Sequence, residues 1–285
     1  ANIAFNGQIN LEGNVTVARS LTILPNSQIS FAGDYGIYNH GSLIIDGGTL
    51  KSITLGNSDQ QWKGITTYRD GDLVCSQATI DNATIGIQIR GAATINENEI
   101  RNCGQGLSIE TATPFTVVGN LIKLNNYGIM ISNNYSSSNM GYIDGNEVTQ
   151  NEIGIVLYNS NTKIAQNDIH ANTRGGLYLL RGSEPIIKGN NISFSENTTS
   201  TRPEITLESD SYPIIDDARN DINADGLGYS LYYNVSTISS RIEKMLARNN
   251  YWGTTNAHQI RDSIYPPWWD VVFEPFSIEP NTFFP

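Results

Sequence analysis

Residues 98–109 read NEIRNCGQGLSI, residues 120–131 read NLIKLNNYGIMI, and residues 146–157 read NEVTQNEIGIVL. Each stretch opens on Asn-x-apolar and closes on a Gly-Ile or Gly-Leu pair followed by alternating apolar residues. Both markers recur along the chain at intervals of about 22 residues, the signature of a repeat architecture. The first marker lies at Gly36, Gly64, Gly86, Gly106, Gly128, Gly154 and Gly176, and the second at Asn98, Asn120, Asn146, Asn167, Asn190, Asn220 and Asn249.

A period of about 22 residues supplies three short strands and three turns, which make one coil of a parallel solenoid. Because side chains alternate along a strand, Ile129 and Ile131 point inward and Met130 points outward. The Asn of the second marker is expected at a turn, in the left-handed conformation and bonded to its neighbours along the stack. The prediction is an all-β, single-stranded, right-handed parallel β-helix of about nine coils, with terminal caps.

The chain is expected to form one domain. Residues 1–35 read as N-terminal strands or a cap, residues 36–253 as the parallel β-helix, and residues 254–285 as a short helix followed by an aromatic extension. Thr254 or Thr255 is the expected cap of that helix. Insertions that lengthen coils are expected at residues 132–142, 193–203 and 216–241.

The repeat resembles right-handed parallel β-helix proteins of the pectate-lyase-like superfamily. It is most similar to the NosD-type repeats, also described as carbohydrate-binding and sugar-hydrolase repeats. The residues that carry the resemblance are the two markers together with Trp62-Lys-Gly-Ile65 and Asn249-Asn-Tyr-Trp-Gly253, over roughly residues 30–253. The resemblance implies the fold and leaves function open, because this scaffold hosts lyases, hydrolases, epimerases, adhesins and non-catalytic repeats.

Composition excludes several classes of partner. With 17 Lys+Arg against 28 Asp+Glu the net charge is −11, which opposes nucleic-acid binding. No apolar run reaches the roughly 20 residues of a transmembrane segment. Cys75 and Cys103 fit no metal or redox motif and read as small buried hydrophobes. NosD-type proteins are linked to copper-site maturation, but three His, three Met and two scattered Cys disfavour a soft-metal site here.

Catalysis on a polysaccharide needs paired carboxylates, or carboxylates around a cation with a basic partner. The candidates on the outward face after the Gly marker are Arg90, Glu110 and Glu208. Arg90 and Glu110 fall on consecutive coils, where a surface ion pair is the simpler interpretation. No nucleophile–His–acid set can be assembled from the sequence around the three histidines.

The same outward face carries an apolar group on successive coils. Its members are Met130, Val156, Tyr158, Tyr178 and Leu180. An apolar patch of this kind on the outer face indicates a surface that binds a partner or one that another part of the chain covers. Three explanations remain open: the C-terminal aromatic tail folds over it, identical chains pack there as a homo-oligomer, or a sugar chain stacks on its tyrosines.

Glu147 and Asp168 are outward carboxylates on consecutive coils. Like charges at that spacing repel unless a cation or base intervenes, and oxygen-rich clusters suit Ca²⁺. The alternative is a solvated acidic edge with Lys163 or Arg174 nearby. No other cofactor is expected.

Two functions follow from these observations. The first is a non-catalytic protein that is secreted, on the cell surface or periplasmic, and that binds polysaccharide or assembles with copies of itself. The second is a polysaccharide-active enzyme, a lyase or a glycoside hydrolase, that uses a groove on one sheet of the β-helix.

Overall fold

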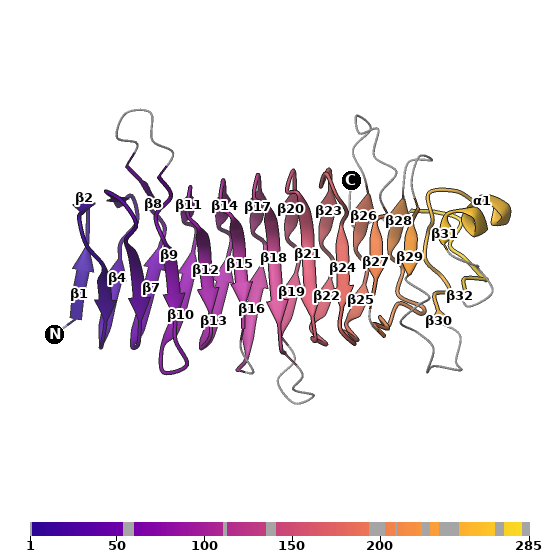
Figure 1. Cartoon of the computed structure of the whole chain (residues 1–285), viewed down its shortest axis with the longest axis horizontal. Coiled ribbons are helices and arrows are strands. Elements are labelled where there is room, and N and C mark those ends of the chain that lie inside the picture. The colour runs from indigo at the N-terminus through magenta and orange to yellow at the C-terminus, as the bar shows by residue number, and fades with distance from the viewer. Residues whose placement is uncertain are drawn as a thin grey trace.

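The chain forms a rod of stacked coils in the computed structural model (Figure 1). The structure describes residues 2–53, 60–110, 113–134, 141–193, 203–208, 210–223, 229–233, 245–265 and 271–280. Three parallel sheets of nine, ten and eleven strands, here called sheets A, B and C, run along the rod. The predicted all-β parallel β-helix is confirmed, and the stack is longer than the nine coils expected.

Sheet A contains β1 (Asn2–Phe5), β4 (Ser20–Ile23), β7 (Ser42–Asp46), β10 (Asp72–Ser76), β13 (Ala92–Asn96), β16 (Phe115–Val118), β19 (Tyr142–Asp144), β22 (Lys163–Ala165) and β25 (Ile186–Lys188). Sheet B contains β2 (Gln8–Leu11), β5 (Gln28–Phe31), β8 (Thr49–Ser52), β11 (Thr79–Asp81), β14 (Glu99–Arg101), β17 (Leu121–Lys123), β20 (Glu147–Thr149), β23 (Asp168–His170), β26 (Asn191–Ser193) and β28 (Asp221–Asn223).

Sheet C contains β3 (Val15–Val17), β6 (Gly36–Asn39), β9 (Gly64–Thr67), β12 (Ile85–Ile89), β15 (Gln105–Ile109), β18 (Tyr127–Ser132), β21 (Ile153–Tyr158), β24 (Leu177–Leu180), β27 (Ile205–Leu207), β29 (Leu231–Tyr233) and β31 (Ile264–Tyr265). The last coils add the parallel pair β30 (Met245–Leu246) and β32 (Val271–Val272), and helix α1 (Ala257–Asp262). Neither α1 nor any other described segment is a helix long and apolar enough to cross a membrane.

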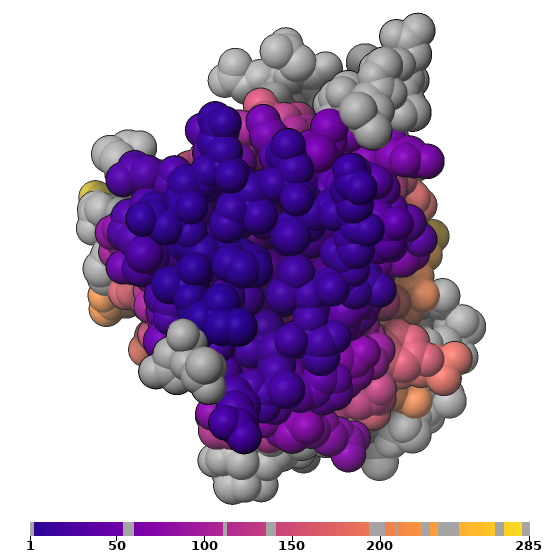
Figure 2. Space-filling model, turned by 90° about the vertical axis from the view of Figure 1, so that its left-hand side faces the viewer, coloured from indigo at the N-terminus to yellow at the C-terminus, as the bar shows by residue number. Residues whose placement is uncertain are grey.

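The first residues of the chain are regular coil strands. Strand β1 pairs with β4, β2 with β5, and β3 with β6, each in parallel register. The end view shows the indigo residues of these first coils filling the N-terminal end face (Figure 2). The stack therefore begins before the Gly36 marker, because these coils contain the strand pattern without the Gly-Ile pair.

The core is a set of aliphatic columns with one member per coil. In sheet B one column occupies the middle position of each strand and is fully buried: Ile80, Ile100, Ile122, Val148, Ile169, Ile192 and Ile222. Near the N-terminal end the Trp62 ring stacks on Phe31 at 4.4 Å, and its indole N–H donates to the Asp81 carbonyl at 2.9 Å. Alternation along each strand leaves the flanking residues of every column facing outward.

The Gly of the first marker is required by close approach between coils. A Cβ at Gly154 would lie 2.6 Å from the Gly176 carbonyl oxygen and 3.0 Å from the Asn172 amide nitrogen. The same overlap with the next coil recurs at Gly86, Gly106 and Gly128. The marker is therefore a packing device at one corner of the coil.

The asparagines of the second marker form a buried ladder between sheets A and B. Asn146 donates to the Val117 carbonyl at 2.9 Å and to the Asn167 side-chain oxygen at 2.9 Å, and its own side-chain oxygen accepts from the Asn120 backbone and side chain, each at 2.9 Å. The same pattern links Asn98, Asn120, Asn146, Asn167, Asn190, Asn220 and Asn250. A second ladder, which the sequence markers missed, joins Asn125, Asn151 and Asn172 at the corner between sheets B and C.

Three local expectations were wrong. The last member of the ladder is Asn250 rather than Asn249. The left-handed residue is the one before each ladder asparagine, as at Glu97, Gly145 and Asn249, because the ladder side chain must turn inward. Helix α1 is capped by Asn256, whose side-chain oxygen accepts from the His258 N–H, and not by Thr254 or Thr255.

The predicted insertions fall largely outside the described residues, which omit 135–140, 194–202, 224–228 and 234–244. The described part of the tail forms the final coil. Val271 pairs with Met245, and the Ser277 N–H donates to the Asn250 carbonyl at 3.0 Å. Phe273 is buried there, and Phe276 packs on the core.

Replacing Asn146 with Ala should lower the free energy of unfolding by about 3 kcal/mol or more, because the change leaves the Asn120 N–H and the Val117 carbonyl of the preceding coil without their side-chain partner. Chemical denaturation measures this loss. The exposed Asn126→Ala is the matched control and should stay within about 0.5 kcal/mol of the parent. Equal losses of stability in the two variants would contradict the conclusion that the asparagine ladder stabilises the fold.

Gly154→Ala should also destabilise the fold, by about 2 kcal/mol, because the added methyl meets the backbone of the next coil. Gly13→Ala is the control, since a Cβ at Gly13 meets nothing within 4 Å. Thermal unfolding of both variants separates the two cases. A Gly154→Ala melting temperature equal to that of Gly13→Ala would refute the packing explanation.

Candidate functional site

The outer face of sheet C presents two rows of side chains along the rod. The middle row contains Thr66, Gln88, Ser108, Met130, Val156, Tyr178 and Thr206. The edge row contains His40, Tyr68, Arg90, Glu110, Ser132, Tyr158, Leu180 and Glu208. Neighbours within a row are one strand spacing apart, about 4.8 Å.

Arg90 and Glu110 form the ion pair that their positions on consecutive coils favour. The Arg90 Nε lies 3.2 Å from Glu110 Oε2, and the Gln88 side-chain amide donates to Glu110 Oε1 at 3.1 Å. Both carboxylate oxygens of Glu110 are therefore engaged. Both partners of the ion pair are about 40% exposed, so the pair contributes little to stability.

Glu208 lies too far from Glu110 for paired-carboxylate chemistry. The two residues are separated by four steps of the edge row, or about 19 Å. Hydrolysis of a glycosidic bond by two carboxyl groups needs roughly 5–9.5 Å between them. The geometry therefore does not support this pair as the catalytic residues of a glycoside hydrolase.

The structure brings together a His–acid pair that sequence reasoning missed. His40 Nδ1 lies 3.1 Å from Asp70 Oδ1, and the imidazole stacks on the Tyr68 ring at 4.2 Å. Tyr68 is followed by Arg90 on the next coil. The markers could have predicted that His40 and Tyr68 are neighbours, since each lies four residues after a marker Gly, but they give no position for Asp70.

The apolar group on this face is half-buried rather than bare. Val156 is only 4% exposed, and Met130, Tyr158, Tyr178 and Leu180 are intermediate. Neighbouring side chains one strand spacing away cover each member. The described tail, residues 271–280, lies on the final coil, so the expectation that it covers this group is wrong for that part of the chain.

Two tyrosines of the group are held in fixed positions. The Arg181 guanidinium lies over the Tyr158 ring at 4.8 Å. The Tyr178 hydroxyl donates to the Arg174 carbonyl at 3.0 Å, and Arg174 is itself paired with Glu152 at 2.7 Å. These contacts restrict the ring positions before any ligand arrives.

Glu147 and Asp168 lie side by side on sheet B, as their register requires. The His170 Nε2 is 3.4 Å from Glu147 Oε1 and 3.7 Å from Asp168 Oδ2. The Asn191 amide donates to the other Asp168 oxygen at 2.7 Å. An imidazole thus lies against both carboxylates, whereas Ca²⁺ takes oxygen ligands. Neither Lys163 nor Arg174 serves this pair, since Lys163 lies over the Tyr142 ring and Arg174 binds Glu152.

Unlike this acidic pair, Glu99 on the same sheet lies beside two basic side chains. Lys123 lies 2.9 Å and Arg101 3.0 Å from Glu99 Oε1. The hydrogen bond from Lys123, followed by the charge of Arg101, lowers the pKa of the Glu99 carboxyl against the opposing effect of partial burial. The outer face of sheet B therefore changes from compensated charge at β14 and β17 to net acidic at β20 and β23.

The side chains in the described ranges do not fit copper. No group of three or more His, Cys, Asp and Glu among them is placed to hold a metal ion. Cys75 and Cys103 are buried, and burial raises the pKa of each thiol to about 12, which opposes the thiolate form that binds soft metals. His40 and His170 lie on different sheets.

Comparison with known proteins supports the β-helix fold. The family described as NosD, periplasmic copper-binding protein, matches residues 8–140. No curated protein matches the chain in sequence.

Solved structures match along nearly the whole rod. A mutant of the periplasmic alginate epimerase AlgG is 13% identical, with a TM-score of 0.59 over 96% of this chain and 72% of that one. A second AlgG structure is 13% identical, with a TM-score of 0.57 over 93% and 75% of the two chains. The A-module of the Azotobacter vinelandii mannuronan C-5 epimerase AlgE6 is 16% identical, with a TM-score of 0.53 over 96% and 91%. At these identities the likeness concerns the fold. The chain is therefore a parallel β-helix repeat protein, as its sequence resemblance implied, and it is similar to NosD over residues 8–140.

Proposed function

We propose that this chain is a periplasmic or secreted β-helix protein that binds a polysaccharide along the outer face of sheet C without cleaving it. The observation that carries the proposal is the pair of restrained, half-buried tyrosines, Tyr158 and Tyr178, on neighbouring coils of that face. Aromatic rings in such positions offer flat apolar surface to the C–H faces of sugar rings. The group formed by Gln88, Arg90 and Glu110, toward the N-terminal end of the face, adds hydrogen-bonding groups for hydroxyls.

The face is suited to an extended chain rather than a small ligand. Its rows repeat one side chain per coil at about 4.8 Å, so a linear polymer lying along the axis meets an equivalent position on every coil. The proteins of similar fold support a carbohydrate ligand and an extracytoplasmic location, since two are periplasmic alginate epimerase structures and one is a mannuronan epimerase module. The NosD match supports the periplasm as well.

Tyr158→Ala and Tyr178→Ala should each weaken polysaccharide binding at least tenfold, because each removes a stacking surface. Affinity electrophoresis through gels containing acidic and neutral polysaccharides, followed by calorimetry on the ligand found, measures the change. Tyr142→Ala is a closely matched control, since Tyr142 is a half-buried tyrosine on sheet A with the Lys163 ammonium 4.8 Å above its ring. Losses no greater than that of Tyr142→Ala would contradict the proposal.

A second copy of the chain is the alternative partner for this face. Tyr178→Glu should then reduce the molar mass measured by light scattering, whereas glycan binding predicts an unchanged mass and lost retention. The near-complete burial of Val156 within one chain favours the glycan, because little apolar area there is left for a second copy.

An enzyme acting on acidic polysaccharide is the second candidate, and the His40–Asp70 pair beside Tyr68 and Arg90 favours it. His40 would remove the proton next to a uronate carboxylate. Return of a proton to the opposite face gives the epimer, and loss of the neighbouring glycosidic oxygen gives the lyase product. Against this role, the Arg90 guanidinium is already paired with Glu110.

Binding without catalysis predicts neither deuterium at C5 nor an unsaturated sugar after incubation with alginate or polygalacturonate in D₂O, with and without Ca²⁺. Nuclear magnetic resonance of the recovered polymer detects both products. Turnover abolished by His40→Ala and retained in Tyr178→Ala would instead establish the enzyme. His258→Ala, a change at an exposed position of helix α1 that belongs to neither outward row of sheet C, controls for loss of an unrelated histidine.

A further inference from the structure

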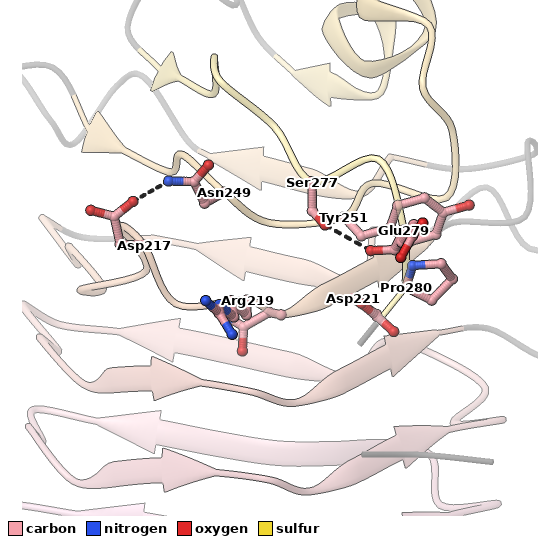
Figure 3. Close-up of a pocket in the computed structure, with 9 residues that line it drawn as sticks. Asp217, Arg219, Asp221, Asn249, Tyr251, Ser277, Glu279 and Pro280 are labelled. Atoms are coloured by element: carbon pink, nitrogen blue, oxygen red, sulfur yellow. Dashed lines mark hydrogen bonds between the residues drawn. The ribbon is translucent and has the colours of Figure 1, made fainter. Parts of the chain in front are cut away.

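A hollow of about 580 Å³ lies on the outer face of sheet B at its C-terminal end (Figure 3). This volume is within the range of small-molecule sites, roughly 300–1,000 Å³. The hollow is on a different sheet from the tyrosines of sheet C and shares no residue with them. It is lined by Asp217, Arg219, Asn220, Asp221, Asn249, Tyr251, Ser277, Glu279 and Pro280.

Three segments distant in sequence build this hollow. Strand β28 and the turn before it form one wall, and the next coil contributes Tyr251, which bridges to Asp221 in parallel register. The tail segment 277–280 crosses beside them, held by the Ser277 N–H on the Asn250 carbonyl at 3.0 Å and by the Asn249 N–H on the Pro275 carbonyl at 2.7 Å. Figure 3 shows Ser277, Glu279 and Pro280 on this crossing segment, next to Tyr251. The hollow therefore depends on the folding of the tail onto the last coils.

The lining is polar and net acidic. It contains three carboxylates, Asp217, Asp221 and Glu279, against the single guanidinium of Arg219, which gives a formal charge of −2. It also contains one aromatic ring, Tyr251. Carboxylate oxygens accept hydrogen bonds from hydroxyl and amine groups, and repel ligands that are themselves carboxylates.

The arrangement suits an organic ligand better than a metal ion. The described residues hold no group of three or more acidic, His or Cys side chains close enough to share an ion, although three acids line the hollow. Asp217 is hydrogen-bonded to the Asn249 side chain. Within the described part of the chain, Glu279 is exposed and its carboxylate has no hydrogen-bond or ion-pair partner, so its oxygens are available to a ligand.

We infer that this hollow binds a non-acidic saccharide unit, neutral or amine-bearing, as a second carbohydrate site separate from the face of sheet C. The ring of Tyr251 supplies the stacking surface, and the exposed carboxylate of Glu279 faces the hydroxyl or amine groups. Uronate residues are excluded by the negative lining. A rod with this site and the proposed sheet C face holds two chemically different glycans at once.

The test is a calorimetric titration of the full chain with four probes: cellohexaose, an oligomer of N-acetylglucosamine, its deacetylated amine form, and an oligouronate. At least one non-acidic probe should bind. Tyr251→Ala and Glu279→Gln should each weaken that binding at least tenfold. Tyr251→Phe, which keeps the aromatic ring, should retain most of the binding. Retained binding in this variant shows that the loss in Tyr251→Ala is due to the missing ring and not to unfolding. Glu274→Gln, an exposed glutamate on the same tail, should bind as the parent does.

The inference is overturned if no non-acidic probe binds, if the loss in Glu279→Gln is matched by Glu274→Gln, or if Tyr251→Ala and Glu279→Gln weaken oligouronate binding instead. Titration with CaCl₂ alone provides a further check, because Ca²⁺ binding lost in Glu279→Gln would identify a metal site. Tyr178→Ala should leave binding at the hollow unchanged. This result distinguishes an error in the proposed binding site at the hollow from an error in the proposed polysaccharide site on sheet C.

Discussion

The rest of the structure depends on the hydrogen-bonded stacking of one coil on the next. In each coil a buried asparagine donates to a strand carbonyl of the preceding coil and to the side-chain oxygen of the ladder asparagine in the following coil, through bonds of 2.9–3.1 Å. Because these amides are buried, a shift of register would leave donors and acceptors without partners at a cost comparable to much of a domain's stability. Register is thereby fixed along the rod.

Fixed register divides the side chains into two populations. Inward positions repeat Ile, Leu and Val because every coil presents the same cross-section to its neighbours. Outward positions have no such restriction and differ from sheet to sheet. Sheet C carries restrained tyrosines and an ion pair, whereas sheet B changes from compensated charge near Glu99 to an acidic hollow at Tyr251. Binding chemistry can therefore vary along the rod without disturbing the fold.

The candidate site was only partly predictable for the same reason. Arg90 and Glu110 could be paired from the sequence, because both follow the Gly marker at the same offset on consecutive coils. The pairing of His40 with Asp70 could not, since Asp70 lies in the turn beyond β9, where the repeat gives no register. The role of the tail was also out of reach, because its residues leave the periodic pattern after Gly253.

The sequence by itself determined the period, the three-stranded coil, the inward columns and the positions of six of the seven ladder asparagines. These features could be read from the sequence because they repeat, since every coil packs against its neighbours with the same cross-section. Only the tertiary structure decided which outward groups meet across turns, how far the apolar group on sheet C is covered, and that residues 277–280 close a hollow against Tyr251. Those contacts join segments without a common period, so they depend on the folded path of the chain rather than on the repeat.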